Sequence, residues 1–264
     1  MDSPAYQRND ALKPGMFVPE SRFGVWFLKT ETWAIHVLKR AFGDLERLID
    51  DRQPRYGTIV DVGCGRGRSF RLLQERFRPS RMIGIDVDGA MLKIAAMETA
   101  QQGLVVEFQQ TTSSRMMLPD ESVDMIFCHQ TFHHLMDQEH ALKEFHRVLK
   151  PGGLFLFAES TRKYIHSPMI RLLFRHPMDV QRTAEEYLAM IRAAGFDVPT
   201  RSISYPYLWW SRNDLGILER WFGIAPASDR EETLLNCVAV KRLRTGSVET
   251  PSPRDSGERV GVRG

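Results

Sequence analysis

Short β-branched runs alternate with helix-patterned segments over most of this chain. The helix patterns, with apolar residues three and four positions apart, cover residues 67–77, 90–102, 139–150 and 183–196. The predicted strands are GTIVDV (57–62), MIGIDV (82–87), LVVEF (104–108), SVDMIFC (122–128) and LFLFAE (154–159), followed by strands near 201–207 and 233–240. Because the first four runs are apolar on both faces, we predict an α/β fold with a parallel sheet covered by helices on each side.

Charge and cysteine content limit the functional classes. The formal net charge is +3, from 36 Lys and Arg against 33 Asp and Glu, which is too mild to suggest a nucleic-acid partner. Cys64, Cys128 and Cys237 are far apart and form no CxxC motif, so we expect no metal site and a reducing compartment. The N-terminus lacks a signal-peptide pattern and no apolar run reaches membrane-spanning length, so we expect a cytoplasmic protein.

Three glycines at alternate positions follow the first strand, in IVDVGCGRG (59–67). Gly63, Gly65 and Gly67 fall on the strand-to-helix turn, where the absence of Cβ atoms lets a ligand lie against the backbone. The spacing differs from Gly-x-Gly-x-x-Gly, and no Gly-Lys-Ser/Thr follows as in a P-loop. Asp86 ends the next strand, where an acid either accepts hydrogen bonds from ribose hydroxyls or caps a helix. Asp88 is the better cap, which favours a ligand role for Asp86.

Four motifs in this order resemble the class I S-adenosylmethionine-dependent methyltransferases, and most closely the broad group that methylates small molecules (methyltransferase domain 11-like). They are IVDVGCGRG, GIDVDGAML, LPDESVDMIFCHQTFHHL and FHRVLKPGGLFLFAE. The resemblance implies a Rossmann-like, doubly wound, mostly parallel seven-stranded sheet of order 3-2-1-4-5-7-6. It also implies S-adenosyl-L-methionine as cofactor, S-adenosyl-L-homocysteine as product, a small-molecule acceptor and no nucleic acid.

The resemblance carries cofactor contacts onto positions of this chain. The glycine turn and the acid before it would line the methionine moiety, Asp86 would hold the ribose and Val87 would lie against adenine. Many relatives have an acid after the third strand where this chain has Thr112, a departure that leaves the adenine contact open. The implied cofactor residues are Asp61, Gly63, Cys64, Gly65, Gly67, Asp86, Val87, Thr112, Ser113, His129 and Gln130.

Methyl transfer requires alignment of the reacting groups and needs a base only if the acceptor must lose a proton. The candidate catalytic residues are His133, His134 and Glu159. One histidine of FHHL is usually structural in the family. Glu159, at the end of the fifth strand, would either orient an acceptor hydroxyl or cap a helix.

Aromatic residues gather in segments outside the alternating core, where the family builds its acceptor pocket. We expect acceptor contacts from Trp26, Trp33, Tyr164, Trp209 and Trp210, which together favour an apolar, aromatic or lipophilic acceptor. The alternative is that these rings pack the added helices onto the sheet. Trp and Phe beside Arg in residues 208–223 also leave open a peripheral membrane contact.

The predicted organisation is a flexible arm (1–22), a single methyltransferase domain (23–243) and a disordered tail (244–264). Within the domain we expect a core (57–243), an N-terminal helical lid (23–52) and an insert (160–182). The leading function is methyl transfer to a small molecule. The alternatives are a non-methylating enzyme with the same cofactor, for example one that transfers an amino group to a quinone, and a non-catalytic cofactor-binding protein. The sequence leaves the oligomeric state open.

Overall fold

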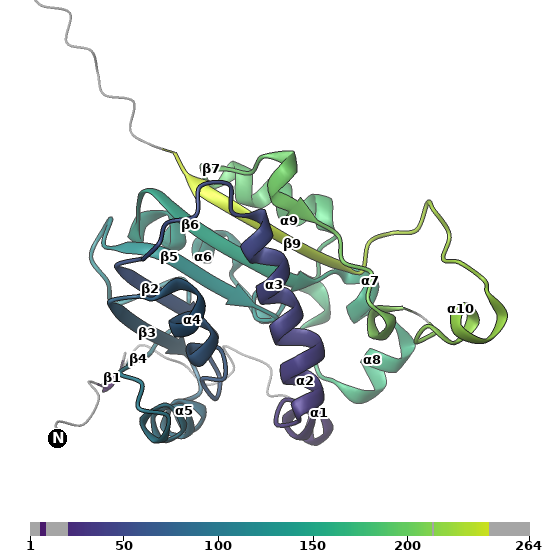
Figure 1. Cartoon of the computed structure of the whole chain (residues 1–264), viewed down its shortest axis with the longest axis horizontal. Helices are drawn as coiled ribbons and strands as arrows, with labels where there is room; N and C mark the ends of the chain where they lie inside the picture. The colour runs from purple at the N-terminus through teal and green to yellow at the C-terminus, as the bar shows by residue number, and fades with distance from the viewer. Residues whose placement is uncertain (1–5, 9–20, 213, 243–264) are drawn as a thin grey trace, which may run out of the picture.

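The computed structural model describes residues 6–8, 21–212 and 214–242, which form one open sheet with helices on both faces (Figure 1). The predicted tail 244–264 and most of the predicted arm lie outside the described residues. One part of that arm, Tyr6–Arg8, is strand β1 and pairs in parallel with β4 at the sheet edge. Within the described part of the chain, no helix is both long and apolar enough to cross a membrane.

The sheet has nine strands in the order β1-β4-β3-β2-β5-β6-β9-β7, with β8 also paired to β9. Strands β1 to β6 pair in parallel, whereas β9 runs antiparallel to β6, β7 and β8. The predicted order 3-2-1-4-5-7-6 is confirmed for the core, with β1 added at one edge and the sixth strand split into β7 and β8. The core strands are β2 (Thr58–Val62), β3 (Arg81–Asp86), β4 (Glu107–Gln110), β5 (Val123–His129), β6 (Leu149–Ser160), β7 (Phe196–Asp197), β8 (Ile203–Ser204) and β9 (Leu234–Lys241).

Two apolar layers hold the helices on the sheet. Along β5, Met125 and Phe127 pack on one face, while Ile126 and Cys128 pack on the other, as strand periodicity requires. The first face is covered by α3 (Lys39–Leu48), α4 (Phe70–Phe77) and α5 (Gly89–Gln101), and the second by α6 (Gln138–Val148) and α9 (Ala184–Ala193). This double coverage agrees with the buried strands expected from the sequence.

Most of the remaining segments lie towards the carboxyl ends of the parallel strands. They are α1 (Arg22–Phe27), α2 (Glu31–Trp33), the π-helical turn η1 (Ala34–Leu38), the 3₁₀ turn η2 (Phe132–His134), α7 (Arg162–Ile165), α8 (Pro168–Leu173), η3 (Met178–Val180), η5 (Trp209–Ser211) and α10 (Ile217–Phe222). The 3₁₀ turn η4 (Thr200–Ser202) instead links β7 to β8 beside β9. In Figure 1, α10 projects from the right of the molecule, beyond α7 and α8. Phe42 and Leu45 are fully buried against the sheet, so α3 belongs to the core rather than to a lid.

Several predicted boundaries differ from the structure. Strand β6 begins at Leu149, within the predicted helix 139–150, and Phe196, in the predicted helix 183–196, begins β7. Two further differences have local reasons. Helix α4 begins at Phe70 rather than residue 67, because Gly67 still has a positive φ of 76°. The third core strand is 107–110 rather than 104–108, because Leu104 donates its N–H to the Thr99 carbonyl at the end of α5. Val105 is consequently exposed, whereas Gln109 is buried within the strand.

Candidate active site

The glycine turn after β2 is a tight loop in which Gly63, Gly65 and Gly67 all have positive φ. A Cβ on Gly63 would lie 2.1 Å from the Thr131 side chain, so this glycine permits close approach of the loop after β5. A Cβ on Gly67 would lie 3.1–3.2 Å from Phe70 and Ala95, where α4 and α5 pack. A Cβ on Gly65 would meet no atom within 4 Å, because this glycine borders an open cavity.

Asp61, the acid before the turn, is a buried carboxyl with little solvation. Its side chain is 3% exposed and accepts a hydrogen bond from the Ser69 hydroxyl. Burial raises the pKa of Asp61 to about 7, partly offset by that hydrogen bond. Asp61 therefore lies in the wall of a cavity, and no cationic side chain among the described residues pairs with its carboxylate.

Asp86, at the end of β3, is tied to the glycine turn. Its carboxylate accepts from the Gly65 N–H and the Asp88 N–H, each at 2.9 Å. Asp88 caps α5 by accepting from the N–H groups of Ala90 and Met91, as predicted. Burial raises the pKa of Asp86, and its two backbone donors oppose this shift. Asp86 is only half-buried, so it both shapes the loop and faces the cavity.

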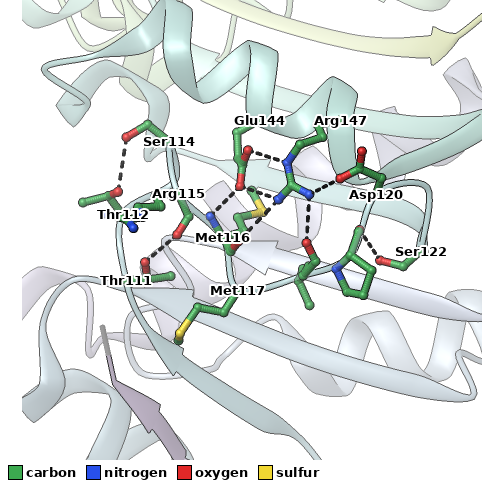
Figure 2. A network of polar contacts seen from close by, with 12 residues as sticks. Thr111, Thr112, Ser114, Arg115, Met116, Met117, Asp120, Ser122, Glu144 and Arg147 are labelled. Carbon is green, nitrogen blue, oxygen red and sulfur yellow. Dashed lines mark hydrogen bonds and ion pairs between the residues drawn. The ribbon is translucent and has the colours of Figure 1, made fainter. Parts of the chain in front are cut away.

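The loop that follows β4 carries Thr112 and Ser113 and is anchored to α6 (Figure 2). Arg147 donates to Glu144 and Asp120, and to the carbonyls of Leu118 and Met116. Glu144 in turn accepts from the Met116 N–H at 2.7 Å. At the other end of the loop, Thr112 shares a 3.2 Å hydrogen bond with Ser114. This network fixes the wall of the cavity next to the third core strand.

These segments enclose a cavity of about 660 Å³ at the carboxyl ends of β2 to β5. Its size is typical of a site for a drug-sized ligand or cofactor. The structure thus brings together every predicted cofactor residue except Gly67, which supports helix packing behind the loop. The predicted residues that line it are Asp61, Gly63, Cys64, Gly65, Asp86, Val87, Thr112, Ser113, His129 and Gln130.

The end of β5 places His129 and Gln130 at the inner wall. The His129 ring stacks on Phe127 and meets Trp33 edge-on, and its Nε2 is buried without a hydrogen-bond partner among the described residues. Burial, with a smaller contribution from His133, lowers the pKa of His129 to about 3. Gln130 has a left-handed φ of 50° and accepts from the Ser160 hydroxyl at 2.6 Å. With this backbone conformation, Gln130 lines both this cavity and a second, neighbouring one.

The second cavity, of about 260 Å³, lies against the first and is mainly apolar. Leu28, Trp33, Gln130 and His134 line both cavities. The walls of the second come from α1, η2, α7, α8 and η5, so chain segments far apart in sequence close it. Of the predicted acceptor residues, Trp33, Tyr164, Trp209 and Trp210 line it.

Trp26 requires a correction. It is 58% exposed and packs on Phe23 with ring centroids 5.4 Å apart, outside the lining of either cavity. The face of α1 that borders the second cavity instead carries Phe23 and Phe27, whose rings both contact Phe174 edge-on. Phe27 follows Phe23 by four residues and shares its face, whereas Trp26 is rotated by about 100° from Phe27 around the helix axis.

Glu159 fills only one of its two predicted roles. It is fully buried, and one carboxylate oxygen accepts from the N–H groups of Thr131 and Phe132 at 2.7 and 2.6 Å. The other oxygen lies 2.6 Å from His133 Nδ1. Because both oxygens are engaged and Glu159 lines neither cavity, it does not contact an acceptor directly. It caps η2 and orients His133.

The sequence analysis missed His176 and Thr131. His176 lies between α8 and η3 and packs against both His133 and His134, with ring centroids 5.1 and 4.9 Å apart. A lone histidine in a 23-residue insert (160–182) gives no local signal for this contact. Thr131 could have been found only by asking which side chain must pass over Gly63.

Comparison with known proteins identifies the domain. Residues 60–157 match the methyltransferase domain family. The chain is 38% identical over 112 residues to malonyl-[acyl-carrier protein] O-methyltransferase 1 of Coxiella burnetii, covering 41% of this chain and 36% of that protein. It is 29% identical over 167 residues to ubiquinone biosynthesis O-methyltransferase of Pseudomonas paraeruginosa, covering 57% and 69%. The chain thus spans little more than a third of the Coxiella protein.

Solved structures share the fold at low sequence identity. The plantazolicin methyltransferase BamL, solved with S-adenosylhomocysteine and a desmethyl-plantazolicin analogue, superposes with a TM-score of 0.59 at 16% identity, covering 83% of this chain and 90% of that one. This likeness concerns the fold alone. The sequence match to the methyltransferase domain family covers residues 60–157, and the resemblance to class I S-adenosylmethionine-dependent methyltransferases seen in the sequence extends to the fold.

Proposed function

We propose that the protein transfers a methyl group from S-adenosylmethionine to a small, apolar or aromatic acceptor bound in the second cavity. The observation that carries this proposal is a pair of adjoining cavities. One lies at the strand ends, where Asp61 and Asp86 border it, and the other is mainly apolar; both are lined by Leu28, Trp33, Gln130 and His134. The named relatives are methyltransferases, so the amino-transferring and non-catalytic alternatives receive no support from them.

The larger cavity fits the family's cofactor. Gly65 offers open space where any side chain would intrude, and Asp86 presents a half-buried carboxylate to that space. In the proposal, Asp86 accepts from the ribose hydroxyls, Thr112 and Ser113 bind the adenine side, and Asp61 faces the methionine end. The bound cofactor supplies a sulfonium-activated methyl group, so the protein's task is chiefly alignment and exclusion of water.

The second cavity favours a small and largely apolar acceptor. Tyr164 and Trp210 meet edge-on at 5.7 Å, and the Trp210 indole N–H donates to the His36 carbonyl at 3.1 Å. These contacts fix the orientation of two aromatic walls from η5 and α7. Its polar lining groups include His134, which also borders the first cavity, and Ser160, which donates to Gln130 between the two cavities. An acceptor with one polar atom on an apolar body suits this arrangement.

For an acceptor that must lose a proton, we propose His133 as the base. Glu159 holds its Nδ1, so Nε2 is the ring nitrogen available to the cavity that His133 lines. Glu159 is then a positioning residue. His134 borders both cavities and shapes the passage between them, and burial keeps its pKa well below the usual value.

The test is production of S-adenosylhomocysteine and a methylated product from phenolic, catecholic and fatty-acid probes. His133→Gln should lower kcat for hydroxyl acceptors and shift the pH profile, while S-adenosylhomocysteine affinity stays within about twofold. Leu172→Ser is a matched control, because Leu172 is exposed on α8 and lines neither cavity. Binding of S-adenosylhomocysteine without turnover of any probe class would argue against this acceptor class.

A lipophilic acceptor could be taken from a membrane surface. Phe23, Leu28, Met169 and Trp209 line the second cavity and are also exposed, so its rim is apolar. On α10, Ile217, Leu218, Trp221 and Phe222 are exposed together beside Arg220. Apolar side chains with an adjacent cation suit an interface containing anionic lipid. We propose that α10 and this rim contact the bilayer when the acceptor is lipophilic.

Flotation with vesicles of anionic and of neutral phospholipid tests the contact. The double change Trp221→Ser and Phe222→Ser should reduce the fraction bound to anionic vesicles. Val105→Ser is the control, because Val105 is 86% exposed on the α5–β4 loop, at the opposite side from α10 in Figure 1. If wild-type protein fails to float with anionic vesicles, the membrane contact is rejected and the methyltransferase proposal stands.

A further inference from the structure

Three histidines converge at the wall of the second cavity. His133 and His134 belong to η2, and His176 comes from the segment between α8 and η3. One ring nitrogen from each lies within 4.8 Å of the others, and their ring centroids are 4.2 to 5.1 Å apart. All three line the cavity. The described residues hold no other group of three such side chains at this spacing.

Gln181 holds the segment that carries His176 against the turn that carries His133. Its buried side-chain amide donates to the His133 carbonyl at 2.8 Å and to the Pro177 carbonyl at 2.7 Å. The second contact is one residue from His176. Because one side chain fixes both backbones, the approach of His176 to His133 is a built feature of the fold and not an accident of two exposed loops.

The chemistry of the cluster suits a metal ligand set. No hydrogen bond involves the rings of His134 and His176 among the described residues, and both rings border the cavity. Neutral imidazoles present lone pairs, the form in which histidine binds metals. Only His133 has a hydrogen-bond partner among the described residues, on its Nδ1, so the three rings gain little from one another, whereas a cation would engage all three.

Glu159 adds the outer support that such sites have. Its carboxylate holds His133 Nδ1 at 2.6 Å, and that carboxylate is fixed in turn by the N–H groups of Thr131 and Phe132. A carboxylate on the far nitrogen of a histidine orients the ring and raises its basicity as a ligand.

We propose that His133, His134 and His176 bind one divalent transition-metal ion of the zinc type, in contrast to our expectation from the sequence. Tetrahedral zinc with Zn–N bonds of about 2.0–2.1 Å places ligand nitrogens about 3.3 Å apart, so the rings must close by about 1–1.5 Å. Three histidine ligands leave a fourth position open. Here that position faces the acceptor cavity.

The open coordination position would bind an oxygen atom of the acceptor. It suits an acceptor that offers a hydroxyl or carboxylate oxygen, which the ion would hold at the end of the cavity nearest Gln130 and His134. This assignment of acceptor chemistry rests on the proposed methyltransferase function. Metal binding itself does not, since the ligands are side chains of this chain alone. When the ion is bound, His133 is a ligand and not a base.

Metal titration of tag-free, chelator-washed protein tests the site. We expect one equivalent of Co²⁺ with the visible absorption of a tetrahedral nitrogen-rich site, displaced by Zn²⁺. His176→Ala should abolish this spectrum, and His176→Gln serves as a second variant if the first fails to fold. Glu159→Gln should weaken Zn²⁺ binding by about 10–100-fold. His166→Ala, an exposed histidine of the same insert, is the matched control and should bind as the wild type does.

Affinity for S-adenosylhomocysteine is measured on each variant as an independent readout of folding and of the first cavity. The metal proposal is overturned if folded wild-type protein takes up no stoichiometric Co²⁺ or Zn²⁺, or if His176→Ala and His166→Ala bind equally well. Turnover of an acceptor by metal-free protein would leave the methyltransferase function standing and reject the role given to the ion. Metal binding without turnover of any acceptor would leave the metal site standing and reject the methyltransferase function, together with the role given to the ion.

Discussion

Asp61→Asn should change how the stability of the ligand-free protein depends on pH. The carboxyl is 3% exposed, and burial raises its pKa to about 7 from an ordinary value of 3.8. Between these two values the folded protein holds a proton that the unfolded chain has released. The free energy of unfolding therefore falls as pH rises from about 4 to about 7. Asparagine keeps the shape and can accept from Ser69, but it does not titrate.

The magnitude follows from the shift. Each pKa unit corresponds to about 1.4 kcal/mol, so a shift of about three units amounts to about 4 kcal/mol once Asp61 is fully ionised. Part of this loss of unfolding free energy has already occurred at pH 5, because pH 5 lies above the pKa of Asp61 in the unfolded chain. Between pH 5 and pH 8, the wild type should lose about 2–3 kcal/mol of unfolding free energy relative to Asp61→Asn.

Urea unfolding at a series of pH values, followed by circular dichroism, measures this difference. Asp197→Asn is the control, because Asp197 is exposed on β7 and its variant should follow the wild-type curve. Binding of S-adenosylhomocysteine, which carries an ammonium group at its methionine end, should lower the Asp61 pKa and release protons near pH 7. Calorimetry in two buffers of different ionisation enthalpy detects that release. Parallel pH curves for wild type and Asp61→Asn would refute the reasoning.

Three further substitutions test the loops around the site. Asp86→Ala should weaken S-adenosylhomocysteine binding by about 1–3 kcal/mol in calorimetry, whereas Asp88→Asn, which keeps the α5 cap, should not. Gly65→Val should abolish that binding in a folded protein, and Gly103→Ala, at another open positive-φ glycine, should only cost about 1–2 kcal/mol of stability. Glu159→Gln should lower the free energy of unfolding in urea by about 1–3 kcal/mol, and Glu159→Ala by more, since three donors then lose their acceptor. No loss in either variant would show that the carboxylate is dispensable.

The core of the fold could be predicted because its determinants are local. Buried β-branched runs and helix periodicity indicated a sheet covered on both faces, and the resemblance supplied its strand order. The third core strand shows the limit of that reasoning. Residues 104–106 were predicted as strand from their apolar side chains. In the structure, however, the Leu104 N–H bonds to a carbonyl at the end of α5, and Val105 is exposed. Gln109 is buried instead, because its side-chain amide donates to the Met117 carbonyl and accepts from the Met117 N–H.

The cofactor side of the site could be predicted for a similar reason. Its residues stand at strand ends within one continuous stretch, and parallel strands bring those ends to a common edge. The acceptor side depends on contacts across long sequence separations. Ser21 donates to the Leu173 carbonyl at 2.5 Å, and Trp210 donates to the carbonyl of His36. No local period encodes such pairings, which is why Trp26 was placed wrongly and His176 was missed.

This division has a consequence for how the two cavities can vary. The walls of the first are β-strand ends buried between two helical layers, where a change of one side chain disturbs close-packed neighbours. The walls of the second come from short helices that touch the core through a few side chains, so their residues can change with less effect on the sheet. Leu28, Trp33, Gln130 and His134 belong to both walls. In the proposed function, the reacting atom of any acceptor must pass these four residues to reach the donor, so they set the alignment that methyl transfer requires.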